Sequence, residues 1–198
     1  FIGDDKVAMI LGDNLFYGHG LEDMLREAAA QDEGAAIFTY HVSNPQHYGV
    51  VEYDKEGNAV DVVEKPEVPP SPWAVTGLYF YDNQVVEIAK NLKPSPRGEL
   101  EITDVNRVYL QQKQMKIMKM GRGFAWLDTG THESLADATD FVRLTETRQN
   151  LKIACPEEVA YRRSLITEEA VLKLAAESGK TLYADYLHRM IELEKEKA

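Results

Sequence analysis

The chain has one cysteine among its 198 residues, and it has no apolar run long enough to cross a membrane. Cys155 therefore cannot form an internal disulfide, which is consistent with a reducing cytoplasm. The first residues lack the basic and apolar regions of a signal peptide, and an initiator methionine is also missing. We therefore expect a cytoplasmic protein with no membrane partner, whose printed sequence opens inside a longer gene product.

Positive charge is scarce as well. Lysine and arginine total 22 against 33 acidic residues, which gives a net charge of −11. Without a broad basic face the protein is not expected to bind nucleic acid, although local cations can still bind small phosphorylated ligands. The five histidines show no metal-binding spacing, and no His or Asp pattern around Cys155 indicates a nucleophile.

Alternating strand and helix patterns fill most of the chain, with no internal repeat. A hydrophobic content of 44% with 28% charged residues is typical of a globular protein. From Leu151 onward no strand pattern recurs and only helical patterns follow, with Pro156 suited to the first turn of one helix and Thr167 to the start of another. We therefore expect an α/β part over residues 1–150 and a helical appendage over residues 151–198.

The strand patterns also suggest how the sheet is connected. Residues 6–11 are a short apolar run, typical of a strand buried on both faces of a parallel sheet. A helical pattern over 21–30 and a second strand over 35–42 predict a parallel crossover. Runs at 49–53 and 59–63, joined by a Gly/Asn turn, predict a hairpin.

Two acidic motifs stand at the ends of apolar runs. Leu11-Gly12-Asp13-Asn14 and Trp126-Leu127-Asp128-Thr129-Gly130 each place an aspartate before a helix start or a turn. Ligands of open α/β sheets bind at such strand ends. Two carboxylates there suit Mg²⁺ bound together with phosphate. A single aspartate after a strand is equally a turn or cap residue, so the pair matters more than either alone.

Two motifs between the aspartates add cations. Glu64-Lys65-Pro66 and Arg97-Gly98-Glu99 place a lysine and an arginine where they could hold phosphate oxygens. A Glu-Lys pair at a strand end is otherwise a solvated edge, and an arginine in a Pro/Gly loop is otherwise an exposed side chain. Taken with the aspartates, the set indicates a phosphorylated substrate.

These motifs resemble, in order and spacing, the glucose-1-phosphate thymidylyltransferase (dTDP-glucose pyrophosphorylase) family of dTDP-rhamnose synthesis. The matching stretches are residues 7–19, 48–52, 64–66, 75–82, 97–104 and 125–131. The resemblance implies a Rossmann-like α/β sheet of the nucleotide-diphospho-sugar transferases, incomplete at its N-terminal side, with a C-terminal helical appendage. It also implies that residues 1–198 lack the family's first third, which carries the triphosphate-gripping loop and the base-reading segments, so that alone they are expected to be inactive.

The resemblance further implies a reaction and a set of site residues. Family members form dTDP-glucose and pyrophosphate from dTTP and glucose 1-phosphate by Mg²⁺-assisted in-line attack on the α-phosphate, and they are homo-oligomers, as tetramers. By match of motifs, Asp13 and Asp128 would hold Mg²⁺. Glu64 would bind the glucose hydroxyls, and Lys65 and Arg97 would bind the sugar phosphate.

Further residues follow from the same resemblance. The sugar pocket would be lined by Gly49, Val75, Thr76, Gly77, Tyr79 and Trp126, although a tryptophan in an apolar strand is equally a core residue. A second, regulatory nucleotide site would use Tyr17, Gly18, Arg122, Glu158 and Arg162. The alternative for this second set is that it only packs the appendage onto the sheet.

Two other functions remain open from the sequence. One is a sugar-1-phosphate nucleotidyltransferase that uses UTP or ATP. The other is a non-catalytic module that binds a sugar phosphate or a nucleotide sugar without turnover, and an assay of turnover would distinguish it. The absence of hexapeptide repeats argues against relatives that are fused to an acetyltransferase.

Overall fold

The computed structural model describes residues 1–197, which form two compact units. The sheet unit is Phe1–Leu135, and the helical unit begins at Ala136. The boundary lies in the first turn of helix α4 (His132–Gln149). The functional division at residue 150 stays a prediction.

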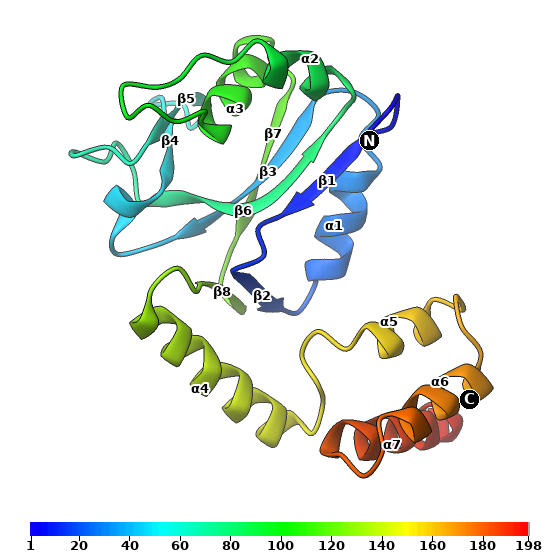
Figure 1. Ribbon diagram of the computed structural model, residues 1–198. Helices are drawn as coiled ribbons and strands as arrows, with labels where there is room; N and C mark the ends of the chain where they lie inside the picture. The colour runs from blue at the N-terminus through cyan, green and yellow to red at the C-terminus, as the bar shows by residue number, and fades with distance from the viewer. Residues whose placement is uncertain (198) are drawn as a thin grey trace. The chain divides into compact units, whose positions relative to one another are not determined.

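The sheet unit is built on a mixed six-stranded sheet (Figure 1). Its strands are β1 (Val7–Ile10), β3 (Ala35–His41), β4 (Gly49–Tyr53), β5 (Ala59–Glu64), β6 (Trp73–Tyr81) and β7 (Met115–Met120). The order is β5-β4-β6-β3-β7, and β1 pairs with the last residues of β6. Only the β3–β7 pair is parallel. A separate antiparallel ribbon joins β2 (Asn14–Gly18) to β8 (Phe124–Asp128).

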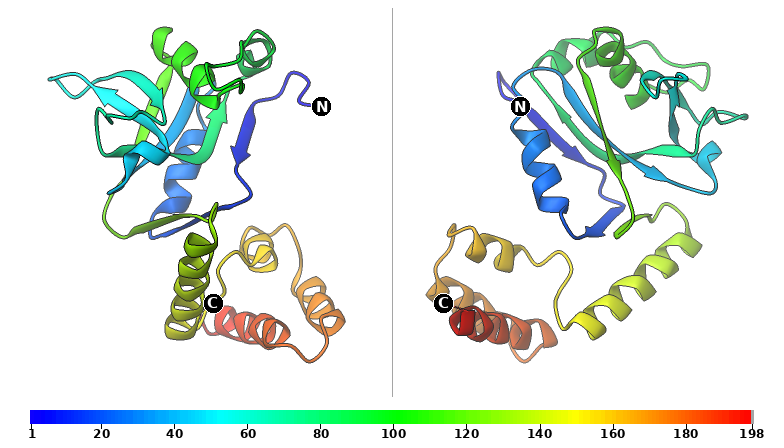
Figure 2. Two further views of the ribbon diagram at one scale, coloured as in Figure 1. Left: turned by 60° about the vertical axis from the view of Figure 1, so that its left-hand side comes forward. Right: turned by 180° about the vertical axis from the view of Figure 1, so that it is seen from behind.

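Helices cover both faces of the sheet (Figure 2). Helix α1 (Leu21–Ala29) packs on one face, and α2 (Gln84–Lys90) and α3 (Ile102–Gln111) pack on the other. A 3₁₀ turn, η1 (Pro45–His47), leads into β4. This two-sided packing is the α/β arrangement expected from the alternating sequence pattern, and it agrees with the Rossmann-like sheet that the family resemblance implies.

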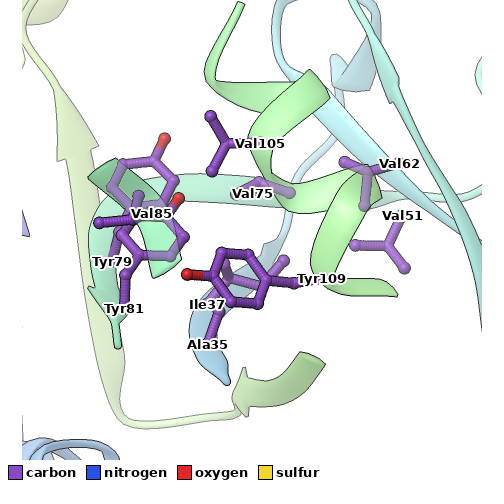
Figure 3. Packing of buried hydrophobic residues seen from close by; sticks show 10 residues of the cluster. All are labelled: Ala35, Ile37, Val51, Val62, Val75, Tyr79, Tyr81, Val85, Val105 and Tyr109. Atoms are coloured by element: carbon purple, nitrogen blue, oxygen red, sulfur yellow. The ribbon is translucent and has the colours of Figure 1, made fainter. Parts of the chain in front are cut away.

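Strand β6 shares its side chains between the two faces, because successive residues of a strand point in opposite directions. Tyr79 and Tyr81 face α3, where their rings stack 6.0 Å apart, and the Tyr109 ring stacks 5.6 Å from Tyr81 (Figure 3). The Tyr81 hydroxyl donates to Asn106 Oδ1 at 2.7 Å. Burial of each aromatic ring contributes roughly 1.5–3 kcal/mol to stability.

The helical unit contains α5 (Pro156–Arg162), α6 (Glu168–Glu177) and α7 (Leu182–Lys197) after α4. Thr167 caps α6, its hydroxyl accepting from the Ala170 N–H at 3.3 Å, and Pro156 opens α5, as the sequence predicts. A core that includes Val171 and Leu187 holds the unit together. Across residues 1–197, the structure has no helix with the length and apolar character needed to span a bilayer.

Two strand predictions near the N-terminus need correction. The run at residues 6–11 was expected to be buried on both faces, yet Ala8 and Ile10 are exposed because only the other face of β1 packs against the core. β1 and β3 do run parallel to each other, as the crossover predicts, with β6 between them and antiparallel to both. After Asp13 the chain forms β2, where a helix start or turn was expected, because β8 provides a pairing partner distant in sequence.

Candidate active site

The β2–β8 ribbon brings the two acidic motifs together. Asn14 lies opposite Asp128 in the antiparallel register. The N–H and the hydroxyl of Thr129 both donate to the Asp13 carbonyl, each at 2.9 Å. Two residues 115 positions apart in the sequence, Asp13 and Asp128 (128 − 13), therefore share one end of a short ribbon.

A cavity of about 210 Å³ opens at this end of the ribbon, within the sheet unit. It is lined by Leu11, Asp13, Asn14, His47, Tyr48, Gly49, Glu64, Lys65, Val75, Gly77, Tyr79, Ile102, Thr103, Trp126 and Asp128. Nine of these positions were assigned to the site from the sequence. Wider grooves, of about 780 and 540 Å³, lie elsewhere on this unit, but only this cavity brings together both aspartates and Lys65.

The charge of Asp13 acts on the Asp128 carboxylate. Burial raises the pKa of Asp128, and the negative charge of Asp13 raises it further. A hydrogen bond from the Gly130 N–H and the positive charge of Lys65 act in the opposite direction. Because a nearby like charge makes the ionised form of Asp128 costly, binding of a cation there would be favourable.

Lys65 is held in an unusual backbone conformation beside this pair. Its φ of 40° lies in the left-handed region, which non-glycine residues seldom adopt. Its N–H donates to the Tyr48 carbonyl at 3.0 Å, and Pro66 restricts the chain after it. Such strain persists only where surrounding structure imposes it, and it is concentrated at functional sites.

Glu64 and Gly49 form a small polar seat at the side of the cavity. They are paired across β4 and β5, and the Thr103 hydroxyl donates to Glu64 Oε2. A Cβ at Gly49 would lie 3.1 Å from Thr103 Oγ1 and 3.3 Å from Glu64 Oε2. The glycine therefore leaves these oxygens room to receive hydroxyl groups of a ligand.

Aromatic rings form another wall. The Trp126 ring centroid lies 5.1 Å from that of Tyr48. Burial raises the pKa of Tyr48, and the charge of Asp128 adds to this effect. Tyr79 lies deeper, and its pKa is raised first by burial and then by the charge of Glu64. The cavity thus has an apolar side next to its charged side, as small-molecule sites commonly do.

Arg97 is engaged by carboxylates. Its Nη2 lies 3.0 Å from Glu99, and its Nη1 lies 3.6 Å from both Glu64 and Glu101. It is not among the residues that line the cavity. A phosphate bound by Arg97 would therefore have to displace at least one of these glutamate side chains.

Thr76 is not brought to the cavity. It is fully buried, and its hydroxyl donates to the Phe38 carbonyl at 3.1 Å. Its neighbours Val75 and Gly77 do line the cavity, and alternation along β6 turns the residue between them to the opposite face. The expectation that Thr76 lines the pocket therefore conflicts with the strand geometry.

A comparison with known protein families fits this geometry. The family model described as nucleotidyl transferase matches residues 1–144. The chain belongs to the nucleotidyl transferase family. Curated relatives named glucose-1-phosphate thymidylyltransferase include one from Neisseria meningitidis, 53% identical over 97% of this chain and 67% of its own length. Those of Mycobacterium tuberculosis and Xanthomonas campestris are 52% and 50% identical over 96% and 94% of the chain.

The chain spans about two thirds of the length of these relatives, 66% and 63% for the last two. Solved structures are similar to part of this chain. A Bacillus anthracis protein assigned as a glucose-1-phosphate thymidylyltransferase, in complex with sucrose, shares 40% identity at a TM-score of 0.64, over 72% of this chain and 56% of its own. A UDP-glucose pyrophosphorylase complexed with UDP-glucose shares 26% identity at 0.63, over 73% and 58%.

Nucleotidyl transferases generally work with a divalent cation and act on sugar-phosphate and nucleotide substrates. Within residues 1–197 there is no cluster of three or more His, Cys, Asp or Glu side chains able to hold a metal. A pair of carboxylates is nevertheless the usual protein contribution to Mg²⁺, which takes its other oxygens from water and substrate phosphates. The chemistry of the Asp13–Asp128 pair therefore fits such an ion.

Sequence reasoning missed several lining residues of this nucleotidyl transferase, chiefly Asn14, Tyr48 and Thr103. Leu11, His47 and Ile102 complete the missed set. Adjacency was the available signal for two of them, because Asn14 follows Asp13 and Tyr48 precedes Gly49. Thr103 gives no such signal, because it reaches the cavity from the first turn of α3.

The proposed regulatory residues are divided between the two units. Tyr17 and Gly18 lie in β2, and Arg122 lies in the turn between β7 and β8. Arg162, on α5, forms two ion pairs, in which its Nη2 lies 2.8 Å from Glu158 Oε1 and 3.0 Å from Glu194 Oε1. Glu158 also accepts a hydrogen bond from the Tyr186 hydroxyl. The regulatory assignment of these five residues stays a prediction.

Proposed function

We propose that the protein containing this chain forms dTDP-glucose and pyrophosphate from dTTP and glucose 1-phosphate. The observation that carries the proposal is the cavity in which two mutually repelling carboxylates, Asp13 and Asp128, lie beside the strained Lys65. Relatives at 50–53% identity bear the name of this activity. The polar seat of Gly49 and Glu64 supplies acceptors for a sugar.

Each side chain then has a defined task. Asp13 and Asp128 would hold Mg²⁺, which supplies charge neutralisation at the reacting phosphates when bound. Glu64 would accept hydrogen bonds from the sugar hydroxyls, and Thr103 would fix its orientation. Lys65 and Arg97 would bind the phosphate of glucose 1-phosphate. To do so, Arg97 would break one or more of its ion pairs with neighbouring glutamates.

The proposed chemistry is an in-line displacement. A phosphate oxygen of glucose 1-phosphate forms a bond to the α-phosphorus of dTTP, and the bond from that phosphorus to the β-phosphate bridging oxygen breaks. The nucleophile is already an anion, so no side chain has to remove a proton. The contribution of the cavity is to orient the two substrates and to neutralise their charges.

A substrate panel tests this proposal. The full-length protein containing residues 1–198 is incubated with Mg²⁺, glucose 1-phosphate and one nucleoside triphosphate at a time, and pyrophosphate release is measured. We expect release with dTTP well above that with ATP, GTP or CTP. Binding of glucose 1-phosphate without release from any triphosphate would instead identify a non-catalytic binding module.

A second function has one observation in its favour. The fold is also similar to UDP-glucose pyrophosphorylase, at a TM-score of 0.63. An enzyme that releases more pyrophosphate from UTP than from dTTP would therefore fall in that class. The same panel, extended to UTP, separates the two activities. A cytoplasmic location and a homo-oligomeric assembly are further parts of the proposal.

A further inference from the structure

The side chain of Asn14 connects three separate segments at the cavity. Its Nδ2 donates to Asp13 Oδ1 at 2.9 Å. Its Oδ1 accepts from the Trp126 indole N–H at 2.6 Å and from the Gly77 backbone N–H at 3.1 Å. One amide therefore holds a site carboxylate, an aromatic wall residue from β8 and the centre of β6.

The chemistry of the partners fixes which way this amide points. An indole N–H and a backbone N–H can only donate, so both must face the amide oxygen. The nitrogen then faces Asp13, whose carboxylate can only accept. All three partners agree with this one orientation, and the reversed orientation would satisfy none of them.

Packing around the amide is tight on the β6 side. A Cβ at Gly77 would lie 2.6 Å from Asn14 Oδ1 and 2.7 Å from its Cγ. Such distances do not occur between ordinary neighbours, so Gly77 has to be a glycine for the amide to enter. This requirement is independent of any ligand, and it ties Gly77 to Asn14 within the folded chain.

Asparagine is also a common turn residue, and the Asn14 N–H does close a turn onto the Leu11 carbonyl at 3.1 Å. That backbone bond needs no particular side chain. The side-chain amide bonds groups outside its own turn, apart from Asp13, and it lines the cavity. A turn preference therefore does not account for its three contacts.

We infer that Asn14 is a positioning residue, which fixes the Asp13 carboxylate relative to Trp126 and so couples the cation site to the aromatic wall. By donating to Oδ1 it leaves Oδ2 of Asp13 directed elsewhere for a cation. Groups that orient a metal ligand commonly contribute 10–100-fold to metal affinity or activity. The inference rests on the proposed function, because it assigns a cation to Asp13.

The main test compares Mn²⁺ binding to the full-length protein by electron paramagnetic resonance, without substrates. Asn14→Ala is expected to weaken Mn²⁺ binding about tenfold. Asn58→Ala is the matched control, because Asn58 Nδ2 also bonds an aspartate, Asp54, at 2.9 Å but at a hairpin turn away from the cavity. The control is expected to bind Mn²⁺ as the wild type does.

A second measurement follows Trp126 in the full-length protein by difference fluorescence, with Trp126→Phe as the reference that lacks its emission. Asn14→Ala is expected to shift its emission, because the indole N–H loses its acceptor. Asn14→Asp keeps an acceptor for Trp126 and Gly77, but it replaces the donor to Asp13 by a second negative charge. It should therefore keep the Trp126 emission while kcat falls about tenfold or more.

The outcomes separate this inference from the proposed function. If Asp13→Asn leaves Mn²⁺ binding unchanged, the cation assignment itself fails. If Asp13→Asn weakens binding but Asn14→Ala matches the Asn58→Ala control, only the positioning role fails. A change confined to the KM for glucose 1-phosphate, with Mn²⁺ binding intact, would make Asn14 a direct substrate ligand and overturn the inference.

Discussion

Carboxylates in the two units have opposite electrostatic surroundings. In the helical unit, a hydrogen bond from the Tyr183 hydroxyl is the main cause that lowers the pKa of Glu157. In the cavity, burial and the charge of Asp13 raise the pKa of Asp128. The first arrangement favours the charged form and stabilises the fold, whereas the second makes the charged form costly and suits a carboxylate that awaits a cation.

The largest effect is expected when one of the two cavity aspartates loses its charge. Asp13→Asn or Asp128→Asn, each isosteric, should lower kcat by on the order of 10²-fold or more, because each removes a charge that would hold the cation. Steady-state pyrophosphate release by the full-length enzyme measures this. Glu157→Gln, which alters a carboxylate of the helical unit, should leave kcat near the wild-type value. A near-wild-type rate for either aspartate variant would remove that residue from the cation site.

The next effect concerns the cations that neutralise the cavity. Lys65→Ala and Arg97→Ala should raise the KM for glucose 1-phosphate by roughly tenfold, since a hydrogen bond to a charged group contributes about 1.5–3 kcal/mol. Lys93→Ala is the control, because Lys93 is exposed in the same loop as Arg97. Initial rates at saturating dTTP give the KM. Weaker dTTP binding with an unchanged KM for the sugar phosphate would contradict the assignment.

A smaller effect is expected from loss of the hydrogen bond that the Tyr183 hydroxyl donates to Glu157. Tyr183→Phe should lower the free energy of unfolding by about 1 kcal/mol, the usual net value of one hydrogen bond. Because the folded pKa of Glu157 is lowered, its contribution is present above the unfolded pKa and is lost as pH falls through the folded pKa. Thermal melts of both proteins should therefore converge at strongly acidic pH. A difference that stays constant across this range would show that Glu157 is not the cause.

The smallest effect has the opposite sign. The folded pKa of Asp128 is raised, so its charged form disfavours folding at pH above that pKa. Asp128→Asn should therefore raise Tm slightly at neutral pH, by a few degrees at most because the side chain is partly solvated. The gain should vanish once the pH falls below the unfolded pKa, where Asp128 is protonated in both states. A lower Tm at neutral pH would mean that Asp128 has a structural role.

Much of the fold was predictable because its signals are local. Hydrophobic periodicity placed β1, β3, β4, β5 and α1, and Pro156 and Thr167 located the starts of α5 and α6. The β4–β5 hairpin followed from its Gly/Asn turn. β2 was missed because a five-residue strand is stabilised by pairing with β8, and no local pattern records that partner.

The candidate site likewise has residues that local motifs predict and residues whose placement depends on distant segments. Asp13, Lys65 and Asp128 were selected from motifs, and the structure brings them to one cavity. Thr76 was selected from the same stretch as Val75 and Gly77, but strand alternation turns it into the core. The motif alone does not show which face of β6 meets the cavity, because the three strands that pair with β6 come from other parts of the chain.

The sequence by itself determined which residue types could form the site. They are two aspartates after apolar runs, a Glu-Lys-Pro motif at a strand end and an arginine in a loop of prolines and glycine. These depend on short-range patterns that each segment carries alone. The tertiary structure alone decided the pairing of β2 with β8, the contact of Arg97 with Glu64 and the contacts of Asn14 with Gly77 and Trp126. Such contacts join segments far apart in the chain, so they exist only once the sheet has fixed the distances between them.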